Sequence, residues 1–188
     1  YDNLVQPIVK VTYVQGRSPK SISKRIPSVY VLGKGKLSWS NSKRIAAFVT
    51  PQSQTVNSFA RGMLAQYSDL IRRKFPKNNI GKAALIFNAL STYGLRYQQD
   101  QTTPFLQIFE DDSVFDTVQY PYEFLESKVG DCDDCTAIYS SMLENLNIPT
   151  AALDVNDPEF GHIYMMFDSG IPISDAGDFF TNEKEYVI

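Results

Sequence analysis

Cysteine, histidine and tryptophan are scarce in this chain of 188 residues, which holds two cysteines, one histidine and one tryptophan. Cys132 and Cys135 lie within one helical turn of each other. This placement excludes a small disulfide-stapled scaffold, which needs more cysteines spread further apart. Two cysteines and one distant histidine also leave a zinc site one ligand short unless an aspartate serves. We therefore expect neither a metal nor a cofactor.

Long apolar runs are also absent. No stretch approaches the roughly 18–20 apolar residues of a membrane-spanning helix, so we expect no membrane span. No signal-peptide pattern is present, and the sequence begins at Tyr1 rather than at a methionine. We interpret the sequence as part of a longer chain.

Acidic residues are scarce in residues 1–50, where Asp2 is the only one beside nine lysines and arginines. The basic residues are Lys10, Arg17, Lys20, Lys24, Arg25, Lys34, Lys36, Lys43 and Arg44. Such a stretch can bind an acidic partner or a polyanion, but lysine-protected edge strands give the same pattern. Because no RNA- or DNA-binding motif accompanies the charge, we expect no nucleic-acid partner.

The spacing of apolar residues changes near residue 56. Residues 1–56 carry β-branched and aromatic runs at 8–14 and 29–32, and predict an N-terminal β-rich segment or accessory subdomain. From residue 57 onward the apolar residues recur at helical spacing. Residues 57–188 therefore form the second predicted unit.

Three helices and then two strands are predicted in residues 57–188. The first helix ends before Pro76, the second runs from a cap at Asn79 to Gly94, and the third begins at Gly130-Asp131. Strand-like runs follow at 150–155 and 162–167. This order predicts the α+β class.

Cys132 opens the third predicted helix, where the positive end of the helix dipole and unpaired N–H groups favour the thiolate. Asp131, Asp133 and Asp134 would raise the cysteine pKa if they faced it. His162 lies in a glycine-led strand, where a lone histidine is more often structural. Combined with a cysteine at a helix N-terminus upstream, it indicates a thiolate–imidazolium pair.

Four segments, taken in order, resemble the transglutaminase-like superfamily of papain-related thiol hydrolases, which includes bacterial cysteine peptidases. The segments are Gln119-Tyr120-Pro121-Tyr122-Glu123-Phe124-Leu125, Gly130-Asp131-Cys132-Asp133-Asp134, Leu146-Asn147-Ile148-Pro149 and Gly161-His162. Tyr97 also resembles an upstream tyrosine of the family. The similarity covers about residues 57–175. It departs from the family pattern at Asn147, where glycine is usual, and in having no tryptophan after His162.

The resemblance implies a papain/transglutaminase-like core, with helices packed on an antiparallel sheet and an N-terminal β-rich extension. It also implies a Cys-His-Asp triad, in which Cys132 and His162 map directly. If residues 168–170 make a tight hairpin, Asp175 lies opposite His162, and Asp178 fits a wider turn. Alternatively, residues 174–185 are an insertion and the acid lies beyond residue 188.

An oxyanion would be held by the Cys132 backbone N–H and one upstream side chain. Gln119 is the candidate for that side chain, and its other expected role is to fix the loop before Pro121. Cys132 and Cys135 also allow a redox pair or an inhibitory disulfide, although Cys135 fits a small buried side chain. The acidic segment lacks the glycine and terminal glutamate of an EF-hand calcium loop.

The function implied is that of a cysteine peptidase, cleaving peptide or amide bonds of a protein or peptide substrate through an acyl-enzyme. A protein-glutamine transglutaminase shares this intermediate, and the sequence does not separate the two. The alternative of another class is a non-catalytic binding module of a larger surface protein. The resemblance to bacterial members favours a secreted or cell-surface protein.

Overall fold

The computed structural model describes residues 3–99, 115–157, 160–172 and 174. The chain divides into two compact units, 1–36 and 37–188. The spacing of apolar residues changes near residue 56, whereas the boundary between the two compact units lies between Lys36 and Leu37. Within the described residues no helix combines the length and the apolar character needed to cross a membrane.

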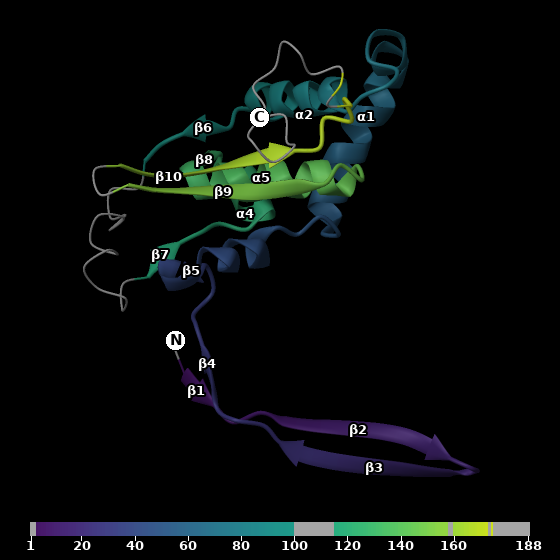
Figure 1. Cartoon of the computed structure of the whole chain (residues 1–188), viewed down its shortest axis with the longest axis vertical. Coiled ribbons are helices and arrows are strands. Elements are labelled where there is room, and N and C mark those ends of the chain that lie inside the picture. Colours follow the sequence, from purple (N-terminus) through teal and green to yellow (C-terminus); the bar gives the residue numbers. More distant parts are fainter. Residues whose placement is uncertain (1–2, 100–114, 158–159, 173, 175–188) are drawn as a thin grey trace. The chain divides into compact units, whose positions relative to one another are not determined.

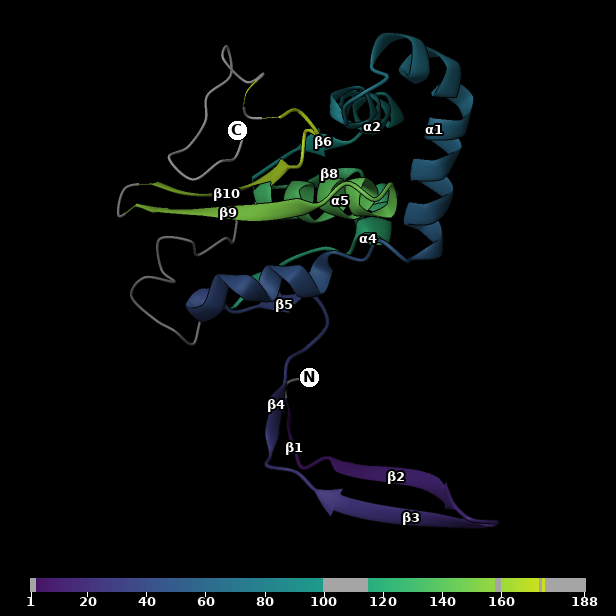
Figure 2. The same cartoon turned by 45° about the vertical axis from the view of Figure 1, so that its right-hand side comes forward.

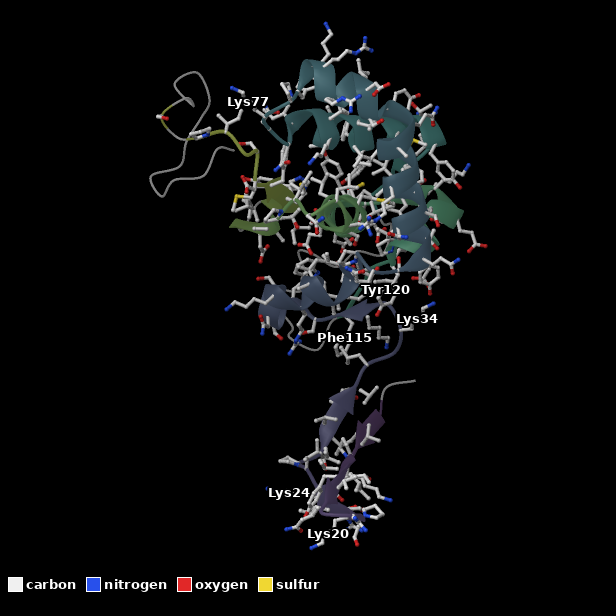
Figure 3. All side chains as sticks on the ribbon, turned by 90° about the vertical axis from the view of Figure 1, so that its right-hand side faces the viewer. Lys20, Lys24, Lys34, Lys77, Phe115 and Tyr120 are labelled. Carbon is white, nitrogen blue, oxygen red and sulfur yellow. The ribbon has the colours of Figure 1, made fainter. Side chains whose placement is uncertain are left out.

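The first unit consists of two antiparallel strand pairs. β1 (Asn3–Val5) pairs with β4 (Val29–Val31), and β2 (Ile8–Gln15) pairs with β3 (Ser18–Arg25). Gln15 lies opposite Ser18, so the β2–β3 hairpin turns through two residues, and Gly16 takes the positive φ of 66° that such a turn favours. Every residue of β2, β3 and β4 is exposed. Lys20 and Lys24 project from this hairpin (Figure 3).

The second unit begins with a helical segment that the sequence did not predict. η1 is a 3-10 helix at Trp39–Phe48, within the stretch expected to be β. It is kinked at Asn41, so its apolar residues show no regular helical period. Ile45 and Phe48 are buried in a small core with Leu37, Val118, Ala137 and Ile163. Burial of these side chains, rather than local propensity, accounts for the helix.

Helices α1 and α2 follow as predicted. α1 (Gln54–Lys74) begins after Ser53, whose hydroxyl accepts the Val56 N–H at 3.4 Å, and it ends before Pro76. α2 (Ile80–Tyr93) begins after Asn79 and ends at Gly94, which has a φ of 103°. A left-handed glycine at this position is a common helix stop.

Within the described residues, four short elements lie between α2 and the central helix. β6 (Arg96–Tyr97) pairs in parallel with β8 (Val129–Gly130). β7 (Asp116–Thr117) pairs with β5 (Lys36–Leu37). α4 (Pro121–Ser127) has proline in its first turn, and its Glu123 side chain accepts the Tyr120 N–H at 2.9 Å.

α5 (Cys132–Asn145) is the central helix of the second unit, with ten buried residues. Ile138, Met142 and Leu143 enter the main core with residues of α1, α2 and α4, whereas Ala137 enters the smaller core beside η1. Two antiparallel strands, β9 (Thr150–Asp157) and β10 (Phe160–Phe167), run along α5 (Figures 1 and 2). The mixture of helices and small sheets is α+β, as expected.

The way in which α5 ends explains why asparagine can stand at position 147, where the family pattern usually has glycine. The Asn147 N–H donates to the Glu144 carbonyl at 3.0 Å, and the Ile148 N–H donates to the Leu143 carbonyl at 3.0 Å. These two bonds make a Schellman stop, which needs a left-handed residue between Leu146 and Ile148. Asn147 provides it with a φ of 58°. Asparagine tolerates this conformation better than most residues other than glycine.

Candidate functional site

Cys132 is the first residue of α5 and is half-buried. The preceding Gly130 leaves room for the Asp134 side chain: a Cβ at position 130 would lie 2.5 Å from Asp134 Oδ2. That oxygen accepts the Asp131 N–H at 3.3 Å and closes the first turn of the helix. The Gly-Asp-Cys-Asp-Asp segment is therefore a helix start in which glycine is required by close packing.

The Cys132 thiol lies against strand β10. It packs in the smaller core with Ile163, and the backbone N–H groups of Ile163, Cys132 and Asp133 act to lower its pKa. Burial is the largest influence and raises the pKa of Cys132 above its usual value, and the negative charge of Asp131 adds to this effect. The buried thiol is therefore a weaker acid than the helix dipole alone would make it.

His162 is the neighbour of Ile163 in β10 and is half-buried. It lies opposite Val155 of β9, and its ring stacks on Tyr164 with centroids 5.8 Å apart. Thr136, one helical turn after Cys132, donates its hydroxyl to the Ile163 carbonyl at 3.4 Å. The first turns of α5 are thus anchored on the β10 backbone one residue away from His162.

The tight hairpin from which Asp175 was deduced is not seen in the described residues 168–172, and its expected return strand lies mostly outside the described residues. Asp168 N–H donates to the Pro149 carbonyl at 2.9 Å, and the Asn79 N–H donates to the Ser169 carbonyl at 2.7 Å. These bonds hold residues 168–170 at the start of α2 (Figure 1). Among the described residues β10 pairs with β9 alone. Asp175 and Asp178 lie outside the described residues, so either assignment stays a prediction.

Gln119 occupies the loop before Pro121 with its whole amide group hydrogen-bonded. Nε2 donates to Asp134 Oδ2 at 2.7 Å and to the Val129 carbonyl at 2.9 Å, and Oε1 accepts the Ser127 hydroxyl at 2.8 Å. A side-chain amide has two N–H donors, and both are used here. This geometry matches the loop-fixing role of Gln119, and an oxyanion role would require one of these bonds to break.

Four buried carboxyl groups surround the start of α5: Asp116 of β7 and Asp131, Asp133 and Asp134. Burial, a hydrogen bond with Asp131 and the charges of Asp131, Asp116 and Asp134 raise the pKa of Asp133 to about 12. Burial also raises the pKa of Asp134 to about 6, although its bonds with Gln119 oppose the shift. At neutral pH Asp133 is therefore a neutral acid.

The oxygens of Asp131, Asp133 and Asp134 lie within 4.8 Å of one another, close enough to hold one cation. An all-oxygen set suits calcium or magnesium. In the described part of the chain Asp131 Oδ1 and Asp133 Oδ1 have no hydrogen-bond partner, whereas both Asp134 oxygens accept protein N–H groups. No cysteine belongs to a candidate metal cluster among the described residues.

Both cysteines are free thiols. Burial is the main reason that the pKa of Cys135 rises to about 12, helped by the charges of Asp134 and Asp131. Cys135 is half-buried and packs against the main core. A thiol with this pKa is almost fully protonated at neutral pH and is a poor nucleophile.

Sequence reasoning missed Trp39, Asp116 and the partnership of Gln119 with Asp134. The Trp39 indole donates to Asp116 Oδ2 at 2.8 Å, although the two residues are 77 positions apart. No local motif contains both residues. One signal was available: Trp39 is the only tryptophan in the sequence.

Comparison of the chain with family models, with curated proteins and with solved structures finds no match in any of the three.

Proposed function

We propose that this protein is a cysteine peptidase of the transglutaminase-like type, with Cys132 as nucleophile and His162 as general acid and base. The observation that carries the proposal is the position of the Cys132 thiol at the N-terminus of α5, against the β10 backbone next to His162. A cysteine at a helix N-terminus and a histidine on the strand that packs against that helix are the two elements that thiol acyl transfer requires.

The papain/transglutaminase-like core is part of the same proposal. Its support is α5, which begins at the cysteine and packs on an antiparallel strand pair that carries the histidine. The order of Cys132 and His162 in the chain agrees with the resemblance, and Asn147 supplies the helix exit that the family usually makes with glycine.

The raised pKa of Cys132 determines how the first step proceeds. Because burial favours the thiol, the proton moves to His162 as the sulfur attacks the substrate carbonyl. A C–S bond forms, and the carbonyl oxygen takes up negative charge beside the backbone N–H of Cys132. The C–N bond then breaks, His162 gives its proton to the leaving amine, and a thioester remains on Cys132.

Resolution of the thioester decides between hydrolysis and transfer. Water gives a peptidase, with His162 accepting the water proton, whereas a primary amine gives a transglutaminase. We favour hydrolysis of a protein or peptide substrate. We place the protein at the cell surface or outside the cell, with no nucleic-acid partner.

The test is incubation with casein, with and without a fluorescent primary amine, using Cys132→Ala as the control. Cys132-dependent fragments support the peptidase, and Cys132-dependent amine incorporation supports the transglutaminase. Binding of casein without either product, unchanged in Cys132→Ala, would establish a binding module and overturn the enzymatic proposal. Titration of Cys132 with iodoacetamide, located by mass spectrometry, checks thiol reactivity independently of substrate.

A further inference from the structure

A cavity of about 260 Å³ lies beside α5, on the side that carries Cys135. Its walls come from α2, β6, α4 and α5. Its lining includes Leu90, Ser91, Tyr97, Phe124, Cys135 and Ile138. The proposed acyl-transfer chemistry leaves this cavity without a role.

Two walls of the cavity come from residues close to the proposed nucleophile in the helix and in the strand pairing. Cys135 lies three residues after Cys132, and residues at this spacing are neighbours on a helix surface. Tyr97 of β6 lies opposite Gly130 of β8, which leads directly into α5. Tyr97 is 62% exposed and lines the cavity together with Cys135.

The lining is mostly hydrocarbon and aromatic. Leu90, Phe124 and Ile138 form the buried floor, whereas Phe87 is 63% exposed at the rim. The Tyr139 hydroxyl donates to the Ala83 carbonyl at 2.8 Å, so the one deep phenol has its hydrogen bond satisfied within the protein. An occupant therefore finds apolar surface in the interior and polar groups only near the opening.

The volume sets the size of the occupant. A cavity of about 150 Å³ lined by apolar side chains is large enough to bind benzene. A cavity of about 260 Å³ therefore accepts an aromatic ring or a branched aliphatic side chain. A carboxylate or ammonium group would lose its hydration there without a buried partner, which costs several kcal/mol.

We propose that this cavity is a specificity subsite that takes an aromatic or branched aliphatic side chain of the peptide substrate, adjacent to the carbonyl attacked by Cys132. The subsite rests on the proposed function. It predicts cleavage next to an apolar residue and discrimination against charged residues at that position. Ser91 on α2 and Cys135 on α5 face the bound side chain.

The first experiment compares three acylated amino-acid chloromethyl ketones, derived from phenylalanine, alanine and glutamate, on the unsubstituted chain. The Cys132 sulfur displaces chloride, a C–S bond forms, and fragment-ion mass spectrometry locates the label. The phenylalanine reagent should alkylate Cys132 about tenfold or more faster than the alanine reagent. The glutamate reagent should be slowest.

Equal rates for the phenylalanine and alanine reagents, with normal iodoacetamide labelling of Cys132, overturn the subsite and leave the proposed nucleophile standing. Failure of every reagent, iodoacetamide included, to label Cys132 overturns both. Faster labelling of Cys135 than of Cys132 by the phenylalanine reagent also overturns the subsite, because the reacting carbon would then lie inside the cavity.

The second experiment fills the cavity from its exposed wall. Ser91→Phe places a ring in the opening, and Thr92→Phe is the matched control because Thr92 is exposed on the same helix but does not line this cavity. Ser91→Phe should remove the preference for the phenylalanine reagent, with iodoacetamide labelling unchanged. The control should keep the preference. Loss of the preference in both variants, or in neither, overturns the subsite.

Discussion

The Trp39 indole N–H donates a hydrogen bond to Asp116 Oδ2 at 2.8 Å and joins η1 to β7 beside the start of α5. Asp116 is 4% exposed and also contributes to the charge around Asp133. The backbone N–H of Thr117 donates a hydrogen bond to the other carboxylate oxygen, Asp116 Oδ1, at 2.8 Å. The only tryptophan therefore fixes a buried carboxyl group near the proposed nucleophile.

Trp39→Phe should lower the free energy of unfolding by about 1–3 kcal/mol, because Asp116 Oδ2 loses its donor while remaining buried. Urea denaturation at pH 7 measures the change. Asp116→Ala, which removes the acceptor, is the partner variant for a double-mutant cycle, and a non-zero coupling energy identifies the bond. Additive effects of the two substitutions would contradict it.

Cys132 should react with iodoacetamide before Cys135. At pH 8 a thiol with a pKa of about 12 is ionised in only about one molecule in ten thousand. The pKa of Cys132 is also raised, chiefly by burial, so its labelling rate should keep increasing as the pH rises through 9. Quenching the reaction at a series of times and analysing the peptides by mass spectrometry measures the labelling rate of each cysteine.

The rate of substrate cleavage in single alanine variants compares the roles of the two cysteines. Cys132→Ala should abolish cleavage, whereas Cys135→Ala should keep much of it. Equal loss in both variants, or earlier labelling of Cys135, would refute the assignment. A requirement for a reducing agent that Cys135→Ser removes would instead identify an inhibitory Cys132–Cys135 disulfide.

His162→Ala should lower activity on the order of 10³-fold or more, with little change in stability. His162 is half-buried on β10, whereas its neighbour Ile163 is 4% exposed and supports the smaller core. Circular dichroism during thermal unfolding separates the two effects. A His162→Ala protein that unfolds readily but keeps its specific activity while folded would restore a purely structural role.

Asp175 is the predicted triad acid, with Asp178 as the alternative. Asp175→Asn should keep the fold and lower the rate by several orders of magnitude if Asp175 supports the His162 imidazolium. Asp178→Asn is the parallel test for a wider turn. Near-normal rates in both variants would exclude these two residues, and a gain of activity in a chain extended beyond residue 188 would place the acid there.

Local sequence signals predicted the elements that carry the site. Gly94 and Asp131 bound helices as predicted, and apolar spacing gave the buried face of α5. Asn79 precedes α2 without a side-chain cap bond, and Tyr67 and Leu70, which share the helical apolar spacing of α1, are exposed. The signals failed for η1, whose kink at Asn41 breaks the helical period and whose formation depends on burial of Ile45 and Phe48.

Long-range contacts were beyond the reach of such signals. The bond between Trp39 and Asp116, and the bonds that tie residues 168–170 to Asn79, join segments that are 77 and about 90 positions apart. The hairpin expected after β10 rested on turn residues alone. A turn signal specifies where the chain reverses, but the partner of the reversed segment depends on tertiary contacts.

Asp133→Asn should stabilise the protein at neutral pH. The fold raises the pKa of Asp133 to about 12, chiefly by burial, so the folded chain holds a proton that the unfolded chain releases above about pH 4. Stability therefore falls as the pH rises from about 4. An amide of the same shape removes this penalty, which at pH 7 reaches on the order of 2–4 kcal/mol. Below pH 4 both states hold the proton, and the two proteins should differ little.

Urea denaturation of Asp133→Asn and the unsubstituted chain between pH 4 and pH 8 measures the effect, with Asp154→Asn on the exposed face of β9 as the control. The difference in free energy of unfolding should grow with pH for Asp133→Asn and stay near zero for the control. A less stable Asp133→Asn protein at pH 7 would mean that the carboxylate is charged in the fold. In that case, a rise in melting temperature with millimolar calcium chloride that Asp133→Asn removes would identify the Asp131–Asp133–Asp134 cluster as a cation site.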